Sequence, residues 1–139
     1  MADRWARRGV PWPIGAWRLV AAEIEAADYH DNLLVRIPAG QDLGIDDLDR
    51  HAFQRGREVG RNNAEVVYTD GAPGLRFFVS YAVSRAREGC RAEMATVVRY
   101  EQPRGRWYFA VVKPFHRLVV PWLFARSVRR AVEGRASGS

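Results

Sequence analysis

The side chains best suited to acid–base chemistry are a histidine, a glutamate and a tyrosine in apolar surroundings. His116, in "PFHR", could act as a general acid or base near neutral pH, or could donate a hydrogen bond to a strand carbonyl. Glu93 could abstract a proton if it faces a poorly solvated pocket, or could pair with Arg91 on the surface. Tyr81 could hold a carbonyl or enolate oxygen, or could be a core residue with a satisfied hydroxyl.

Metal and cofactor chemistry is not indicated by the remaining motifs. The histidines at 30, 51 and 116 are scattered, and no HxH, HExxH or CxxC spacing occurs. There is no GxGxxG or phosphate-binding loop and no GxSxG elbow, so we expect neither a metal nor a cofactor. The single cysteine, Cys90, begins an apolar run, which favours a small buried hydrophobe over a reactive thiol.

Composition indicates one globular domain with a basic surface. The chain has 139 residues, of which 47% are hydrophobic, and carries a net charge of +6. This charge permits binding to nucleic acid or an anionic membrane, but no dedicated DNA-reading motif is present, so we expect no specific nucleic-acid partner. The sequence contains no run of about 18 uncharged apolar residues, so we expect no transmembrane helix. We expect a cytoplasmic protein.

The pattern along the chain predicts an arm with a short helix over 1–27, one domain over 28–132 and a disordered tail over 133–139. Within the domain, "HDNLLVRIPAG" (30–40) predicts a strand and "GIDDLDRHAFQRGREVG" (44–60) a short helix capped by Asp46 or Asp47. Period-two alternation over 64–70, 75–86 and 91–101, with tight turns between, predicts an antiparallel meander.

The last long segment predicts a helix with an apolar stripe. Its members recur at helical spacing and are Tyr108, Val111, Val112, Phe115, Leu118, Val119 and Trp122. Pro114 and Pro121 each remove a backbone donor, so kinks or a break into two helices are expected. The order of elements favours an α+β fold in which a curved antiparallel sheet wraps around a long kinked C-terminal helix.

The space between sheet and helix is either filled by side chains or open to a ligand. A structure with a ligand there would show an enclosed pocket with a few convergent polar groups. The residues predicted to contact an apolar substrate are Tyr68, Phe77, Val79, Met94, Thr96, Tyr100, Tyr108, Val112, Phe115 and Trp122.

Two segments carry a family resemblance. "ADYHDNLLVRIPAG" and "ATVVRYEQPRGRWYFAVVKPFHRLVVPWLFAR" resemble the two ends of the bacterial family catalogued as domain of unknown function 2867. That family is similar to the START-like, helix-grip superfamily, whose members bind apolar small molecules or act as polyketide cyclases and hydratases. The resemblance therefore implies a cavity. The segment between Gly40 and Asn63 is shorter than the family's usual helical insertion, so a smaller or more open pocket is expected.

Two functions are compatible with these observations. The first is a helix-grip protein that binds a small apolar or polyketide-like molecule, with cofactor-free cyclase, dehydratase or isomerase chemistry drawn from His116, Glu93 and Tyr81. The second is a non-catalytic protein that binds a ligand, or whose basic arm and basic C-terminal turn contact an acidic protein, membrane surface or nucleic acid. A homodimer formed through exposed tryptophan and phenylalanine fits either function.

Overall fold

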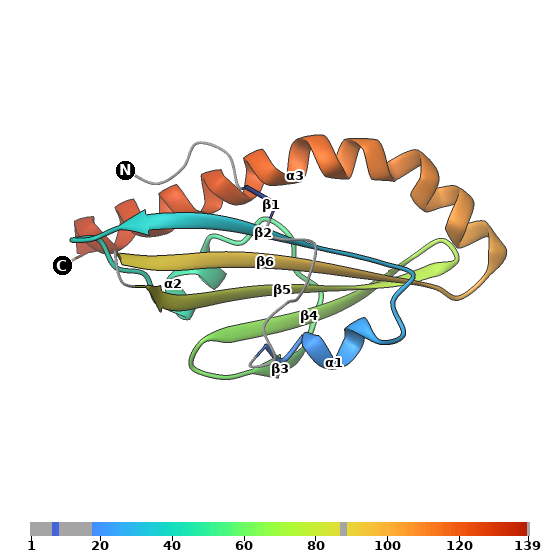
Figure 1. Ribbon diagram of the computed structural model, residues 1–139, viewed down its shortest axis with the longest axis horizontal. Helices are drawn as coiled ribbons and strands as arrows, with labels where there is room; N and C mark the ends of the chain where they lie inside the picture. The colour runs from blue at the N-terminus through green and yellow to red at the C-terminus, as the bar shows by residue number, and fades with distance from the viewer. Residues whose placement is uncertain (1–6, 9–17, 87–88, 139) are drawn as a thin grey trace.

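A single six-stranded antiparallel sheet organises the chain (Figure 1). The computed structural model describes residues 7–8, 18–86 and 89–138. The strands lie in the order β1-β2-β6-β5-β4-β3, and their bounds are β1 (Arg7–Arg8), β2 (Tyr29–Pro38), β3 (Arg57–Arg61), β4 (Glu65–Ala72), β5 (Leu75–Ala86) and β6 (Gly89–Tyr100). The helices are α1 (Ala21–Ile24), α2 (Ile45–Arg50) and α3 (Pro103–Gly138). The predicted α+β architecture with a helix-grip shape is confirmed, as is the meander of β4, β5 and β6.

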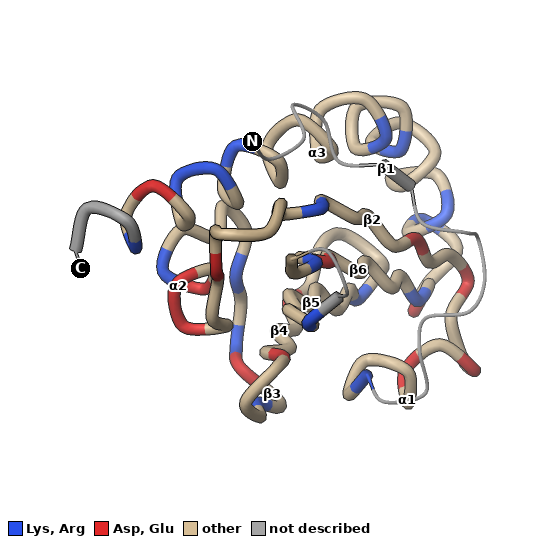
Figure 2. The backbone as a smooth tube through the Cα atoms, turned by 60° about the vertical axis from the view of Figure 1, so that its left-hand side comes forward, with Lys and Arg blue, Asp and Glu red and all other residues tan. Residues whose placement is uncertain are grey.

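Helices cover both faces of the sheet (Figure 2). The face toward α2 and α3 carries the main core, in which Tyr81 and Met94 from the sheet are buried with Phe124 from α3. The opposite face packs a smaller cluster of Phe78, Val97 and their neighbours against the α1 segment. The alternation predicted for β5 and β6 therefore holds, because successive side chains of a strand point to opposite faces.

Helix α3 is one continuous helix that arches over the sheet (Figure 1). Pro114 and Pro121 lie inside it without dividing it, so of the two expected effects, kinks or a break into two helices, the break is wrong. Each proline removes only one backbone donor, and a curved helix packed against a sheet tolerates that loss. The helix also runs to Gly138, through the segment predicted to be a disordered tail. No helix in the described part of the chain is long and apolar enough to cross a membrane.

The side of α3 that packs on the sheet differs from the predicted stripe. Phe109, Val120, Phe124 and further residues toward the C-terminal end are buried, whereas Phe115 is 67% exposed and Leu118 is 69% exposed. The helix carries two apolar stripes, and only the one that begins at Phe109 continues through the small and branched side chains of 125–132. On the predicted stripe, the positions after Trp122 are occupied by the exposed arginines Arg126 and Arg130. Because charged side chains stay in water, this stripe faces outward.

The start of α3 is fixed by close contact with the turn between β4 and β5. The Gly74 carbonyl accepts hydrogen bonds from the amides of Glu101 and Gln102, at 2.9 and 3.0 Å. A Cβ atom added to Gly105 would lie 2.0 Å from that same carbonyl oxygen, so only glycine fits there. Gly74 itself has a φ of +72°, a conformation that glycine adopts without strain.

Two local predictions around α2 are wrong. The helix is capped at Gly44, whose amide donates to the Asp47 carboxylate at 3.1 Å, so Asp47 acts from the first turn and not from the cap position. Residues 57–61 form β3 beside β4, whereas the sequence pattern assigns 57–60 to the segment of this short helix, whose length Gly56 and Gly60 are expected to limit. Gly56 permits this pairing because a Cβ atom there would lie 2.3 Å from the Thr69 carbonyl oxygen. Of the predicted arm over 1–27, the structure describes β1 and residues 18–27, and α1 lies within the part where a short helix was predicted.

Candidate functional site

Two tyrosine hydroxyls of the main core donate hydrogen bonds to α2 and the loop that follows it. Tyr81 is fully buried and donates a hydrogen bond to the Gln54 carbonyl at 2.7 Å. Tyr68 donates to the Asp49 carboxylate at 2.5 Å. Burial and the contact with Asp49 raise the pKa of Tyr68 to about 12, and burial raises the pKa of Tyr81 further. Both tyrosines therefore match the core interpretation, with satisfied hydroxyls that hold the α2 segment over the sheet.

Glu93 lies on the opposite face of the sheet from Tyr81. Its carboxylate accepts a hydrogen bond from the Asn32 amide at 2.8 Å and lies 3.6 Å from the guanidinium of Arg18. The grouping of Glu93 with Tyr81 and His116 in one acid–base site is therefore wrong, because strand alternation sends Glu93 and Met94 to different faces. Neither the surface pair with Arg91 nor the pocket position describes its environment.

His116 lies on the middle of α3, half-buried, with both ring nitrogens shielded from solvent. On this same stretch of α3, Lys113 places its Nζ 4.9 Å from the centroid of the Tyr29 ring. Asp31 and Thr96, which are register partners on β2 and β6, belong to the sheet face that α3 crosses. Polar groups thus interrupt the apolar contact between helix and sheet at this level. The acid–base role of His116 stays a prediction.

The predicted ligand-contacting residues divide into two groups. The strand members share the face toward α2 and α3, where the structure brings together Tyr68, Phe77, Val79, Met94, Thr96 and Tyr100. On α3, Val112 is half-buried, but Tyr108 is 39% exposed and Trp122 36% exposed, and both lie with Phe115 on the outward stripe. These three cannot line a space between helix and sheet. Ligand contact for the others stays a prediction.

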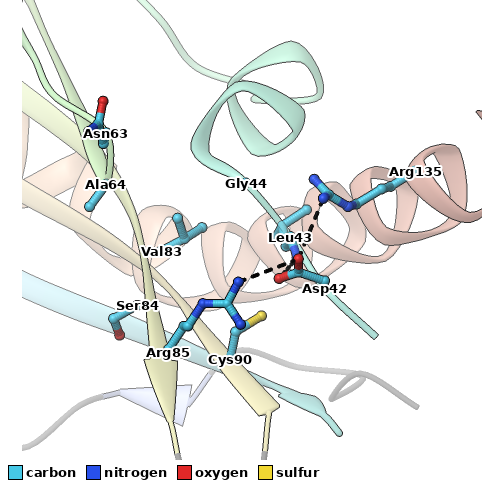
Figure 3. Close-up of a pocket in the computed structure, with 10 residues that line it drawn as sticks. All are labelled: Asp42, Leu43, Gly44, Asn63, Ala64, Val83, Ser84, Arg85, Cys90 and Arg135. Atoms are coloured by element: carbon cyan, nitrogen blue, oxygen red, sulfur yellow. Dashed lines mark hydrogen bonds and ion pairs between the residues drawn. The ribbon is translucent and has the colours of Figure 1, made fainter. Parts of the chain in front are cut away.

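A cleft of about 500 Å³ opens at the other end of this interface, near the C-terminal end of α3 (Figure 3). Four parts of the chain that are distant in the sequence form it: residues 42–44, residues 63–64, the hairpin of β5 and β6, and Arg135. Leu43, Ala64, Val83 and Cys90 supply its apolar lining. Asp42, Asn63, Ser84, Arg85 and Arg135 supply its polar groups. The cleft is open to solvent.

Asp42 stands between two arginines of the cleft (Figure 3). Its Oδ2 lies 3.4 Å from Arg135 and 3.9 Å from Arg85. Arg135 also binds the Asp47 carboxylate at 2.6 Å. Burial opposes the ionisation of Asp47, but the hydrogen bonds from Arg135 and Gly44 outweigh it and lower the pKa of Asp47 below its usual value. The side chain of Arg85 is 89% exposed, so its guanidinium is the more available cation.

The described lining of this cleft offers few groups suited to nucleophilic or acid–base chemistry. Cys90 is buried, and burial together with the charge of Asp42 raises its thiol pKa, which disfavours the nucleophilic thiolate. Among the residues that the structure describes, Asp42 is the only carboxylate that lines it, and this carboxylate is shared between two arginines. Within the described ranges, no group of three histidine, cysteine or acidic residues could hold a metal ion.

Sequence reasoning missed this cleft because no local motif encodes it. Arg135 belonged to the predicted tail and Arg85 to a predicted strand end. Only the continuation of α3 past residue 132 brings Arg135 to Asp42 and Asp47. The available signal was the helix-compatible composition of "RSVRRAVEGR", which continues the alanine and valine spacing of the buried stripe.

Comparison with known families identifies the chain. The model of DUF2867, a protein family of unknown function, matches residues 45–123, more than half of the chain. The chain belongs to this family. The match covers the segment from α2 to the middle of α3, including the "TVVR" strand and the "PFHR" segment. The comparisons with curated proteins and with solved structures found no match.

Proposed function

We propose that this DUF2867 protein binds a small amphipathic molecule with an acidic head group in the cleft between the α2 segment, β5, β6 and α3. The observation that carries the proposal is the pairing of an apolar lining with an exposed guanidinium, Arg85, at a cleft of about 500 Å³. Clefts of this size that combine apolar walls with polar groups are typical of small-molecule sites. A planar guanidinium binds a carboxylate with two parallel hydrogen bonds.

We infer kinship with START-like, helix-grip proteins from the arrangement of α3 over a curved antiparallel sheet. That kinship supports ligand binding as a class of function and says nothing of a reaction. The cyclase, dehydratase or isomerase chemistry expected from the sequence needs convergent acid and base groups. Its three candidates lie on two faces of the sheet, so binding without catalysis is the function that this geometry favours.

Decanoate and decanol form a matched pair of probes, because they share an apolar chain and differ in the carboxylate. We expect decanoate to bind more tightly, with chemical-shift changes that map to Val83, Ser84 and Arg85 in an NMR titration. Arg85→Gln should reduce the preference for decanoate by about tenfold, the effect of losing one charge-assisted contact. Arg91→Gln, an equal charge change at an exposed residue of β6, is the control.

The proposal fails if the two probes bind with equal affinity, or if Arg85→Gln and Arg91→Gln change the affinity equally. Shift changes confined to residues beneath the middle of α3 would move the binding site to the surroundings of His116. That result would restore the site expected from the sequence and exclude the cleft.

A further inference from the structure

The outward side of α3 presents a continuous apolar stripe. Its most exposed members are Trp107, Val111, Phe115 and Leu118, at 75%, 70%, 67% and 69% exposure, and Tyr108, Val119 and Trp122 border them. We name these seven residues the outer stripe. Tyr108, Val111, Phe115, Leu118 and Trp122 follow each other at spacings of three and four, so they share one helix face. Monomeric soluble proteins rarely leave so large an apolar surface without a partner.

The same helix is strongly basic. Between Pro103 and Arg130 it carries seven lysine or arginine residues and no aspartate or glutamate: Arg104, Arg106, Lys113, Arg117, Arg126, Arg129 and Arg130. Figure 2 shows these cationic positions at intervals along α3. Arg104 precedes Tyr108 by four residues and Arg126 follows Trp122 by four, so an arginine stands at each end of the outer stripe. The guanidinium of Arg126 lies 5.5 Å from the Trp122 ring centroid.

These observations define the chemistry of the partner, which must be apolar over a length of about 22 Å and anionic at its border. A second copy of this chain would bring two faces of the same high positive charge together, which is unfavourable. Nucleic acid would satisfy the arginines but would leave the most exposed apolar side chains in water. The surface of a bilayer that contains anionic lipids satisfies both requirements.

We propose that the protein docks on anionic membrane surfaces through the outer stripe of α3. The helix lies in the plane of the interface, with Phe115 and Leu118 inserted among the upper acyl chains. Trp107 and Trp122 lie at the level of the head groups, where amphipathic indole rings are favoured. Arg104, Arg126 and Arg130 contact lipid phosphates. The sheet, the core and the cleft of Figure 3 remain in water, so this docking does not depend on the proposed ligand.

Cosedimentation with vesicles tests the proposal. The intact protein should bind vesicles of phosphatidylcholine mixed with phosphatidylglycerol and should not bind vesicles of phosphatidylcholine alone. High salt should weaken the binding. The double variant Phe115→Glu, Leu118→Glu should lower the partition coefficient by about tenfold or more, because two charges would enter the interface. The control is Val59→Glu on β3, which adds a single glutamate at a valine that is 47% exposed and lies outside α3.

A second pair of variants separates charge from apolar insertion. Arg126→Glu with Arg130→Glu should reduce binding to the anionic vesicles by about tenfold. Arg57→Glu, at an exposed residue of β3, makes the same kind of charge change elsewhere and should have a much smaller effect. Circular dichroism should show the same helical content in all variants, because every substituted side chain is exposed.

Three outcomes would overturn the proposal. The first is no binding of the intact protein to anionic vesicles at low salt. The second is equal binding by the intact protein and the Phe115→Glu, Leu118→Glu variant, which would assign membrane contact to another segment such as the basic arm. The third is a dimer in sedimentation equilibrium that the double variant dissociates while vesicle binding is absent, which would make the outer stripe a self-association surface.

Discussion

Arg18 and Glu65 form an ion pair on the face of the sheet that packs against the α1 segment, opposite α3, and both side chains are fully buried. The Arg18 Nε donates to a Glu65 oxygen at 3.1 Å, and another Arg18 nitrogen donates to Ser80 at 2.9 Å. Glu65 also accepts hydrogen bonds from the backbone amides of Leu19 and Val20. These hydrogen bonds to one carboxylate hold the segment before α1 against β4 and β5. The smaller apolar cluster on this face, which includes Phe78 and Val97, packs beside the ion pair.

Glu65→Ala should destabilise the fold by about 3–5 kcal/mol, because the buried Arg18 guanidinium would lose its hydrogen-bonded counter-ion and be left with the partly exposed Glu93 carboxylate at 3.6 Å. The free energy of unfolding in urea, followed by circular dichroism, measures this loss. Glu58→Ala removes an ion pair with Arg61 in which the Glu58 side chain is 45% exposed, and should cost less than about 1 kcal/mol. Equal losses in the two variants would show that the buried pair contributes no more than a surface pair.

The contact of Gly105 with the Gly74 carbonyl predicts a large effect of a single methyl group. Gly105→Ala should cost about 1–3 kcal/mol, because the start of α3 must move away from the turn between β4 and β5. Gly71→Ala on β4 is the matched control, since a Cβ atom there meets only an ordinary contact at 3.8 Å. Thermal unfolding compares the two. A Gly105→Ala variant as stable as Gly71→Ala would mean that the helix start adjusts freely.

Much of the sheet could be predicted from the sequence because period-two alternation directly encodes which side chains face the core. Phe77, Val79 and Met94 fell on the predicted face for this reason. The orientation of α3 could not be predicted equally well, because two apolar stripes satisfy helical periodicity and local pattern does not rank them. The choice depends on the residues after 122, where one stripe continues with Phe124 and Val128 and the other meets Arg126.

The candidate site was less predictable than the fold, for a related physical reason. Its cleft depends on Asp42, Arg85 and Arg135, which are joined only by long-range pairing. Residue types such as His116 and Glu93 draw attention in a sequence because their chemistry is versatile. Which face of its strand or helix each residue occupies, and which partner it contacts, is set by tertiary contacts such as that between Glu93 and Arg18.

The hydrogen bond from Tyr68 to Asp49 predicts a loss of stability at alkaline pH. Burial and Asp49 raise the pKa of Tyr68 to about 12, from 10.0 in the unfolded chain. The stability that this group contributes is therefore present below pH 10 and is lost as the pH rises toward about 12. Two pKa units correspond to a contribution of about 2–3 kcal/mol.

Tyr68→Phe should consequently show a shallower decline of the free energy of unfolding between pH 10 and pH 12 than the intact protein. Some decline remains in the variant, because Tyr81 is also buried and its pKa is also raised. Tyr108→Phe, at an exposed tyrosine of α3, should retain the full decline. Identical slopes for Tyr68→Phe and the intact protein would contradict the raised pKa.

Cys90 is the only cysteine and provides a direct probe of the cleft wall. It is 5% exposed, and burial raises its thiol pKa, so both access and thiolate population are low at neutral pH. We expect its reaction with Ellman's reagent at pH 7 to be about tenfold or more slower in the native protein than in urea.

The variant Cys90→Ala, Arg91→Cys moves the thiol to the exposed neighbour and should react at nearly the unfolded rate. If the native thiol reacts as fast as this exposed thiol, the loop at Asp42 and Leu43 opens readily, and the cleft has no fixed wall there.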